Sequence, residues 1–180
     1  AKNCSLNTSI VVNTPENNPI IYKLKNLVQD KTKLDWKMHS TADDAVILLD
    51  SIKSQKNIPA IPFDMIVSEL KAPKRETQLT VFGFPLSLGV GKKISAIAKT
   101  SQPSSGLIEL PRFDNGKLNN FYLLDDPSVS GFSGGPVITL FPEIGGAKFN
   151  FNKNPDINKV VGLVHGSISD NRGSGGFAAI

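Results

Sequence analysis

Hydrophobic and polar residues alternate along this 180-residue chain over short stretches, which is the pattern of β-strands rather than of helices. Turns rich in Asn, Pro and Lys, such as residues 14–19, separate these stretches. We expect strands at residues 9–12, 20–24, 34–38, 45–49, 79–84, 94–98, 107–110, 120–124, 137–140, 160–164 and 176–180. Many short strands without a helical period indicate an all-β fold, either a sandwich or a barrel.

The alternation fades in the middle of the chain, where Pro and Lys residues recur. We expect residues 51–78 to form a connector, with a short helical turn near residues 64–70 as its only regular element. The expected organisation is therefore a first group of strands over residues 1–50 and a second group over residues 79–180. A chain of this length can bury one good core or two small packed barrels.

Composition agrees with a loop-rich all-β protein, since 39% of the residues are hydrophobic and the chain has 15 Gly and 12 Pro. The net charge of +4 raises the question of nucleic-acid binding. The basic residues are scattered, and the densest clusters, at residues 71–75 and 92–93, have the character of loops. We therefore expect a solvated surface and no nucleic-acid partner. No apolar run has membrane-spanning length and no signal peptide is evident, so we expect no membrane partner.

Cys4 is the one cysteine of the chain, so an intrachain disulfide is excluded and packing must supply the stability. A single cysteine favours a reducing compartment such as the bacterial cytoplasm. The chain begins with Ala rather than Met, which indicates processing or further domains of a longer chain. His, Cys and carboxylate residues form no set with the spacing of metal ligands, and no Gly-rich loop opens a helix. We therefore expect neither a metal nor an organic cofactor.

Residues 131–136, with the sequence G-F-S-G-G-P, are the most informative stretch of the chain. Gly131 allows a tight turn, so the amides of Gly131 and Ser133 can converge beside the Ser133 hydroxyl. Two converging amides next to a nucleophile form an oxyanion hole, as acyl transfer requires. The alternative is an ordinary Gly-rich turn with a surface serine. An esterase of the α/β-hydrolase kind is excluded, because Pro136 and the β-branched residues after it disfavour the helix that its nucleophile needs.

This loop resembles that of the chymotrypsin-like (trypsin-like) serine peptidases, particularly the bacterial members without disulfides. Residues 81–89 resemble the turn that opens their second barrel, and Asp125 lies where they have an aspartate ahead of the serine loop. Residues 161–166 resemble the strand that pairs with substrate, and residues 173–180 resemble the strand that closes the specificity pocket. The resemblance implies two packed six-stranded-type β-barrels, with residues 1–50 as part of the first and residues 79–180 as the second. It also implies a serine endopeptidase that cleaves polypeptides.

The resemblance also implies a catalytic carboxylate. Residues 39–48 are similar to the family pattern His-x-x-x-Asp-hydrophobic-Ala, which assigns Asp43 as the residue that orients the base. Asp44 departs from the pattern, because an apolar residue is usual at this position. If the alignment with the family pattern shifts by one residue, Asp44 becomes the catalytic carboxylate instead. The assignment to Asp43 keeps Ala45 at the small buried position of the pattern. An aspartate that merely begins a strand is the third interpretation.

The catalytic base is missing. The chain contains two histidines, His39 and His165, and neither lies where the family has its catalytic histidine. Residues 1–4, with the sequence A-K-N-C, resemble the family motif Ala-x-His-Cys, with Asn3 at the position of the histidine. An amide is not basic, so Asn3 leaves Ser133 without a general base. An inactivated enzyme, a pseudo-peptidase that binds peptides on the same fold, and a fragment with its base and the start of its first barrel elsewhere all remain open.

By the same resemblance, Val164 faces a specificity pocket and His165 turns toward the catalytic aspartate. A slip of one residue would place His165 in the pocket and favour acidic substrates. A structural His165, hydrogen-bonded within the core, is the further alternative. No acidic residue occupies positions 127–132, so the pocket should accept uncharged side chains. The residues expected to line it are Pro127, Ser128, Val129, Val164 and Gly166.

Phe132 directly precedes the serine. Vertebrate digestive relatives have an aspartate there, which pairs with a newly cleaved N-terminus and orders the oxyanion hole. An aromatic side chain cannot form that ion pair. We therefore expect no activation by insertion of an N-terminus.

Overall fold

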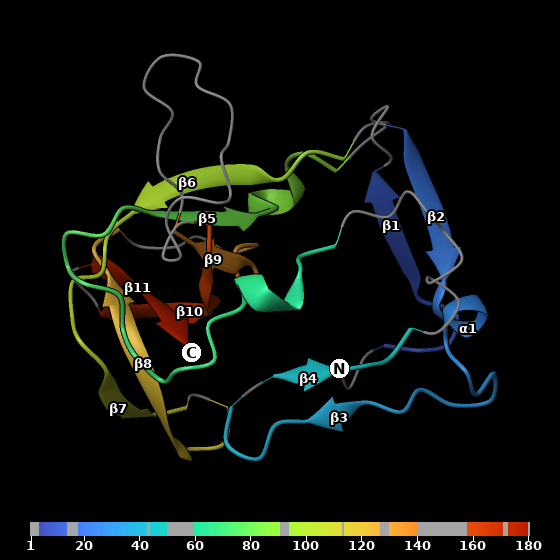
Figure 1. Ribbon diagram of the computed structural model, residues 1–180, viewed down its shortest axis with the longest axis horizontal. Coiled ribbons are helices and arrows are strands. Elements are labelled where there is room, and N and C mark those ends of the chain that lie inside the picture. Colours follow the sequence, from blue (N-terminus) through green and yellow to red (C-terminus); the bar gives the residue numbers. More distant parts are fainter. Residues whose placement is uncertain are drawn as a thin grey trace. The chain divides into compact units, whose positions relative to one another are not determined.

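A computed structural model describes residues 4–13, 18–42, 44–49, 60–90, 94–112, 114–126, 130–139, 158–170 and 173–179 (Figure 1). The chain divides into two compact units. The first unit comprises Ala1–Ala60 and Gly89–Ser95, and the second comprises Ile61–Leu88 and Ala96–Ile180.

The first unit contains two small antiparallel sheets. Strands β1 (Ser9–Asn13) and β2 (Pro19–Lys23) form one, and β3 (Lys37–Met38) and β4 (Ala45–Val46) form the other. A single helical turn, α1 (Leu24–Leu27), follows β2 directly. It buries Leu24 and Leu27, which lie on one side of the turn because they are three residues apart. The strand expected at residues 20–24 therefore ends one residue early.

The second unit is an antiparallel sheet of seven strands in the order β6-β5-β9-β10-β11-β8-β7. Two short 3-10 turns, η2 (Phe63–Met65) and η3 (Pro85–Ser87), accompany it. The strands are β5 (Leu79–Gly83), β6 (Ile97–Ser101), β7 (Ile108–Pro111), β8 (Leu118–Leu124), β9 (Pro136–Ile138), β10 (Val160–Asp170) and β11 (Gly173–Ala179).

The core of the second unit follows from the period of two along its strands. In β5, Leu79, Val81 and Gly83 are buried, while the two residues between them are only partly buried. One core residue, Phe132, comes from the serine loop rather than from a strand. The complete buried cluster is Leu79, Val81, Tyr122, Leu124, Phe132, Val137 and Val164.

The chain after β6 returns to β8, near the other end of the strand order. Pro103 forms an isolated antiparallel bridge with Leu124, and the Ser104 amide donates to the Leu123 carbonyl at 2.8 Å. The sheet therefore curls, which brings its two sides together. Within the described residues, however, no continuous strand ladder closes it into a barrel.

The expected all-β fold is confirmed, whereas several boundaries differ. The strand expected at residues 94–98 is shifted to 97–101, and the helical turn expected near residues 64–70 is the shorter η2. Residues 61–78, expected to belong to a connector, are part of the second unit. Ile66 forms a parallel bridge with Val160, and the Val67 amide donates to the Val160 carbonyl at 3.0 Å.

Hydrogen bonds of Asp125 link the end of β8 to the end of β6. Its carboxylate accepts hydrogen bonds from the Ser101 hydroxyl at 2.7 Å and from the Gln102 amide at 2.8 Å. Desolvation acts to raise the pKa of this carboxyl, but the hydrogen bonds from Gln102 and Ser101 favour the charged form and hold the pKa below its ordinary value. Asp125 therefore joins the two sides of the curled sheet.

We expect Asp125→Asn to lower the free energy of unfolding by about 1 kcal/mol at neutral pH, since it weakens hydrogen bonds to a solvent-screened charge. Because the folded-state pKa is depressed, the stabilisation is present above the ordinary value of 3.8 and is lost as the pH falls through the folded-state value. Urea unfolding at about pH 7 and about pH 2.5 measures the difference between wild type and variant, which should shrink in acid.

Asp126→Asn is the matched control. Asp126 is half-exposed and pairs with Lys99 at 3.0 Å, so its removal should change stability by less than about 1 kcal/mol. Equal effects of the two substitutions, or an Asp125 effect that does not change with pH, would show that Asp125 has no special role in joining the sheet.

Candidate functional site

The serine loop places two neighbouring side chains in opposite environments. The Phe132 side chain is only 3% exposed and belongs to the hydrophobic core, whereas Ser133 is exposed to solvent. The aromatic ring therefore anchors the loop from within and leaves the hydroxyl at the surface.

Backbone hydrogen bonds attach this loop to the strands on either side. The Gly134 amide donates to the Val164 carbonyl at 2.6 Å, and the Val164 amide donates to the Gly135 carbonyl at 2.9 Å. On the other side, the Phe84 amide donates to the Gly131 carbonyl at 2.9 Å. The loop is thus held between the end of β5 and the middle of β10.

Glycine is required at two positions of the loop. Gly131 has φ +105°, and a Cβ atom there would lie 2.4 Å from the Phe84 carbonyl oxygen. A Cβ atom on Gly135 would lie 1.9 Å from the Phe82 carbonyl oxygen. Neither contact is possible for a real side chain, so the loop packs onto β5 only because these residues lack one.

Two amides of the loop have no hydrogen-bond acceptor in the described part of the chain. Among the described residues, the amides of Gly134 and Gly135 donate to main-chain carbonyls, whereas no described group accepts a hydrogen bond from the amide of Gly131 or Ser133. The Ser133 hydroxyl likewise has no partner among the described residues. A serine hydroxyl and two amides that have no partner among the described residues are the chemical components for nucleophilic attack and stabilisation of an oxyanion. Convergence of the two amides on one point stays a prediction.

Several predicted site residues lie outside the described residues, namely Asn3, Asp43, Pro127, Ser128 and Val129. Asp44 is described and partly buried, and its carbonyl accepts a hydrogen bond from the His39 amide at 2.9 Å. Asp44 therefore takes part in the turn before β4.

The His39 side chain closes the same turn. Its Nδ1 atom accepts hydrogen bonds from the amides of Thr41 at 3.3 Å and Ala42 at 2.9 Å. An imidazole nitrogen that accepts two main-chain hydrogen bonds is occupied in holding the backbone. This local contact was missed from the sequence, although a side chain that bonds an amide two or three residues ahead is a known turn device.

His165 contacts an aromatic residue of the sheet. Its ring centroid lies 5.2 Å from that of Phe121, with a tilted geometry. Near it, the Arg112 guanidinium donates to both carboxylate oxygens of Asp114 and holds the pKa of that carboxyl below its usual value, with a minor contribution from His165. Val164 is 2% exposed and packs in the core. The orientation of His165 toward Asp43 and the place of Val164 in a specificity pocket both stay predictions.

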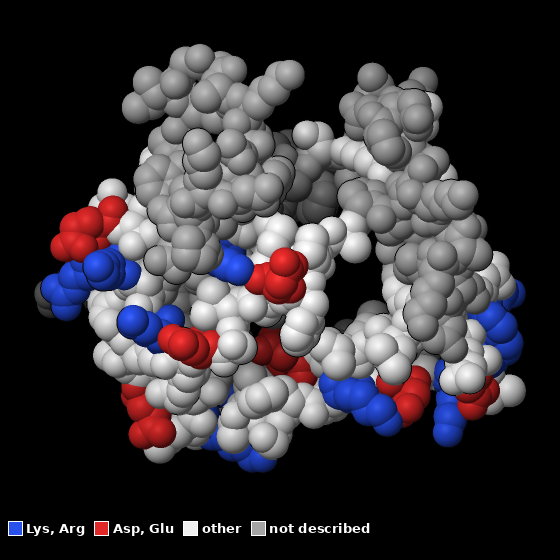
Figure 2. Space-filling model, in the orientation of Figure 1, with Lys and Arg blue, Asp and Glu red and all other residues white. Residues whose placement is uncertain are grey.

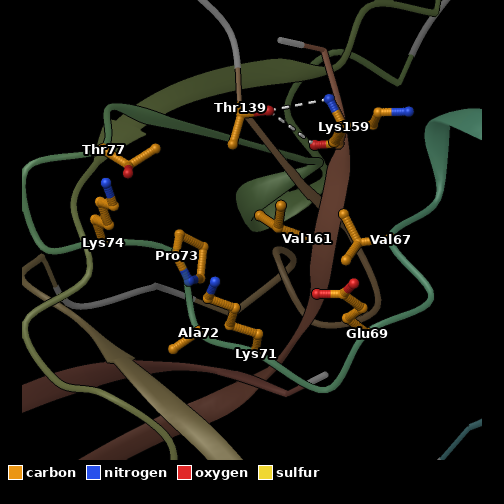
Figure 3. A pocket seen from close by; sticks show the side chains of 10 residues that line it. All are labelled: Val67, Glu69, Lys71, Ala72, Pro73, Lys74, Thr77, Thr139, Lys159 and Val161. Carbon is orange, nitrogen blue, oxygen red and sulfur yellow. Dashed lines mark hydrogen bonds between the residues drawn. The ribbon is translucent and has the colours of Figure 1, made fainter. Parts of the chain in front are cut away.

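The second unit also contains a cavity of about 320 Å³, which the sequence did not predict (Figure 3). Its Thr139 hydroxyl accepts a hydrogen bond from the Lys159 amide at 3.0 Å. Lysines, one carboxylate and an apolar floor surround it, and none of the predicted site residues does. The sequence held no signal for it, because it forms only where the segment before β5 packs on β10. The lining residues are Val67, Glu69, Lys71, Ala72, Pro73, Lys74, Thr77, Thr139, Lys159 and Val161.

Charges of both signs are interspersed over the face seen in Figure 2. Ion pairs of the described residues include Lys99 with Asp126 at 3.0 Å and Lys37 with Asp35 at 2.9 Å. The described residues contain no group of three or more His, Cys, Asp or Glu side chains that could hold a metal ion. No helix within the described ranges is long and apolar enough to cross a membrane.

We expect Gly135→Ala to destabilise the protein by roughly 2 kcal/mol, because the added Cβ atom must displace the loop from β5. Gly106→Ala is the matched control, since a Cβ atom on Gly106 meets nothing within 4 Å. Urea unfolding compares the two variants with wild type. If both alanine variants unfold at the same urea concentration as wild type, the close contact between the loop and β5 does not exist.

Comparisons with known proteins do not establish a family. No family model and no curated protein matches the chain. Among solved structures, an inactive serine-to-alanine mutant of Rv3671c from M. tuberculosis H37Rv is 16% identical, with a TM-score of 0.49 and coverage of 95% of this chain and 74% of that one. The inactive form of the Rv3671c protease is 18% identical (TM-score 0.48, coverage 95% and 76%), and the active form from M. tuberculosis is 16% identical (TM-score 0.45, coverage 95% and 63%). At these TM-scores and identities the likeness carries no further argument.

Proposed function

We propose that this chain is a trypsin-like serine endopeptidase domain, built of two packed β-barrels, which cleaves polypeptides through Ser133. The observation that supports it best is the serine loop, where the exposed Ser133 and the amides of Gly131 and Ser133 have no hydrogen-bond partner in the described ranges, on a backbone that packing holds in place. In this proposal the Ser133 oxygen attacks the carbonyl carbon of a peptide bond. The amides of Gly131 and Ser133 then stabilise the negative charge on the carbonyl oxygen.

The attack also requires a base that accepts the serine proton. We assign to Asp43 the role of orienting this base, as the resemblance implies. His39 and His165 have other contacts, with the amides of a turn and with the Phe121 ring respectively. Asn3 is the residue that the resemblance assigns to the base position, and this assignment leads to a second candidate function. In that function the chain is a catalytically inactive module that binds polypeptides on the same fold.

The two candidate functions predict different reactivity of Ser133. If Asn3 occupies the base position, a fluorophosphonate probe should label the chain barely above background, because loss of the base costs several orders of magnitude in rate. Asn3→His should restore labelling at Ser133. Mass spectrometry of the labelled peptide measures both the extent and the site.

Ser133→Ala in the Asn3→His background is the control, and it should abolish labelling. Rapid labelling of the unmodified chain would mean that another group supplies the base. Labelling at a serine other than Ser133 would contradict the peptidase proposal.

We also expect an Asn3→His variant to cleave after medium-sized uncharged side chains, because residues 127–132 bring no acidic group to the proposed pocket. A peptide library with the cleavage position varied measures this preference. Efficient cleavage after Lys or Arg would contradict the proposed pocket. A strict preference for Glu that is lost in His165→Ala would instead place His165 in the pocket.

A further inference from the structure

The turn after β5 has an unusual backbone. Leu86 and Ser87 both adopt left-handed dihedral angles, with φ 52° and φ 61°, which residues with a side chain seldom do. The Leu86 side chain is 77% exposed, so burial of an apolar group does not offset this strain. A strained conformation that is maintained without packing indicates a constraint from another part of the structure.

That constraint comes from the serine loop. The Phe84 amide donates to the Gly131 carbonyl at 2.9 Å, and the Leu86 amide donates to the Ser130 carbonyl at 3.3 Å. The turn is closed separately, by a hydrogen bond of 3.1 Å from the Ser87 amide to the Phe84 carbonyl. The Leu86 N–H group belongs to the central peptide of this four-residue turn, and a left-handed third residue accompanies the reversed orientation of that peptide when Pro is second.

Because the peptide group is planar, the hydrogen bond to the Ser130 carbonyl also affects the direction of the Gly131 N–H group. In a trans peptide the C=O and N–H bonds point in opposite directions. The hydrogen bond accepted by the Ser130 carbonyl therefore fixes the direction of the Gly131 N–H group. A bond of 2.8 Å from the Gly135 amide to the Phe132 carbonyl fixes the Ser133 N–H group in the same way.

We propose that the Leu86 N–H group positions the Gly131 amide as an oxyanion donor, and that Leu86 is a positioning residue. This inference rests on the proposed function of the serine loop. Of the two bonds that orient the donor amides, the one to Ser130 is the longer and comes from a strained turn, so it is the more easily lost. Its loss frees the Ser130–Gly131 peptide to rotate, which removes one donor while Ser133 and its own amide stay in place.

Matched substitutions isolate the backbone effect. Leu86→Val introduces a β-branched residue that the left-handed region disfavours, whereas Leu88→Val makes the same side-chain change at an exposed residue with an ordinary φ of −64°. Leu86→Gly adopts left-handed angles freely and keeps the N–H group. Leu86→Ile serves as a second β-branched variant.

Labelling with serine ¹³C-carbonyl and glycine ¹⁵N gives an NMR cross-peak only for Ser–Gly pairs. The sequence has four, Ser105–Gly106, Ser130–Gly131, Ser133–Gly134 and Ser174–Gly175. In Leu86→Val and Leu86→Ile only the Ser130–Gly131 cross-peak should shift or broaden, and the other three report that the fold is intact. In Leu86→Gly and Leu88→Val the Ser130–Gly131 cross-peak should keep its position.

Kinetics of an Asn3→His background supply the second readout. Leu86→Val should lower kcat roughly tenfold or more and leave KM unchanged, because an oxyanion donor acts in the transition state. Leu88→Val should leave both constants unchanged. An unshifted Ser130–Gly131 cross-peak in Leu86→Val, or a shifted one with unchanged kcat, overturns the inference. If the Asn3→His background hydrolyses no peptide, the proposed function fails, and the cross-peak alone decides whether Leu86 orients the Gly131 amide.

Discussion

Burial of the Phe132 side chain is the interaction on which the serine loop depends. Full burial of a phenylalanine stabilises a fold by roughly 1.5–3 kcal/mol, and this ring belongs to the core between β5, β8 and β10. Because the ring points inward, the next residue, Ser133, is presented to solvent. The packing requires that Gly83 has no side chain, since a Cβ atom there would lie 2.6 Å from the ring. The packing of Phe132 in the core therefore determines the exposure of Ser133.

The described hydrogen bonds that hold this loop join it to main-chain groups of Phe84, Leu86 and Val164, and none of these groups titrates. The turn that supplies the Leu86 amide to the Ser130 carbonyl includes two residues with left-handed φ angles, Leu86 and Ser87.

The alternation of apolar residues predicted strands such as β5 and β8, and the glycines around Ser133 predicted a close approach of the loop to its neighbours. The sequence did not predict the contact of Leu86 with Ser130, because main-chain hydrogen bonds between distant segments leave no side-chain pattern. It also misplaced β6, a strand whose Lys-Thr-Ser end carries no apolar alternation and whose register is set by pairing with β5. The turn closed by His39 is local and could have been predicted from its spacing.

The most direct test of the account is a crystal structure of the Asn3→His variant with a peptide boronic acid bound. Boron forms a bond with the serine oxygen and carries an oxygen atom at the position of the oxyanion. The account predicts a covalent adduct at Ser133, with that oxygen about 2.7–3.1 Å from both the Gly131 and the Ser133 amide nitrogens. An adduct whose oxygen faces solvent, away from these two amides, would contradict it.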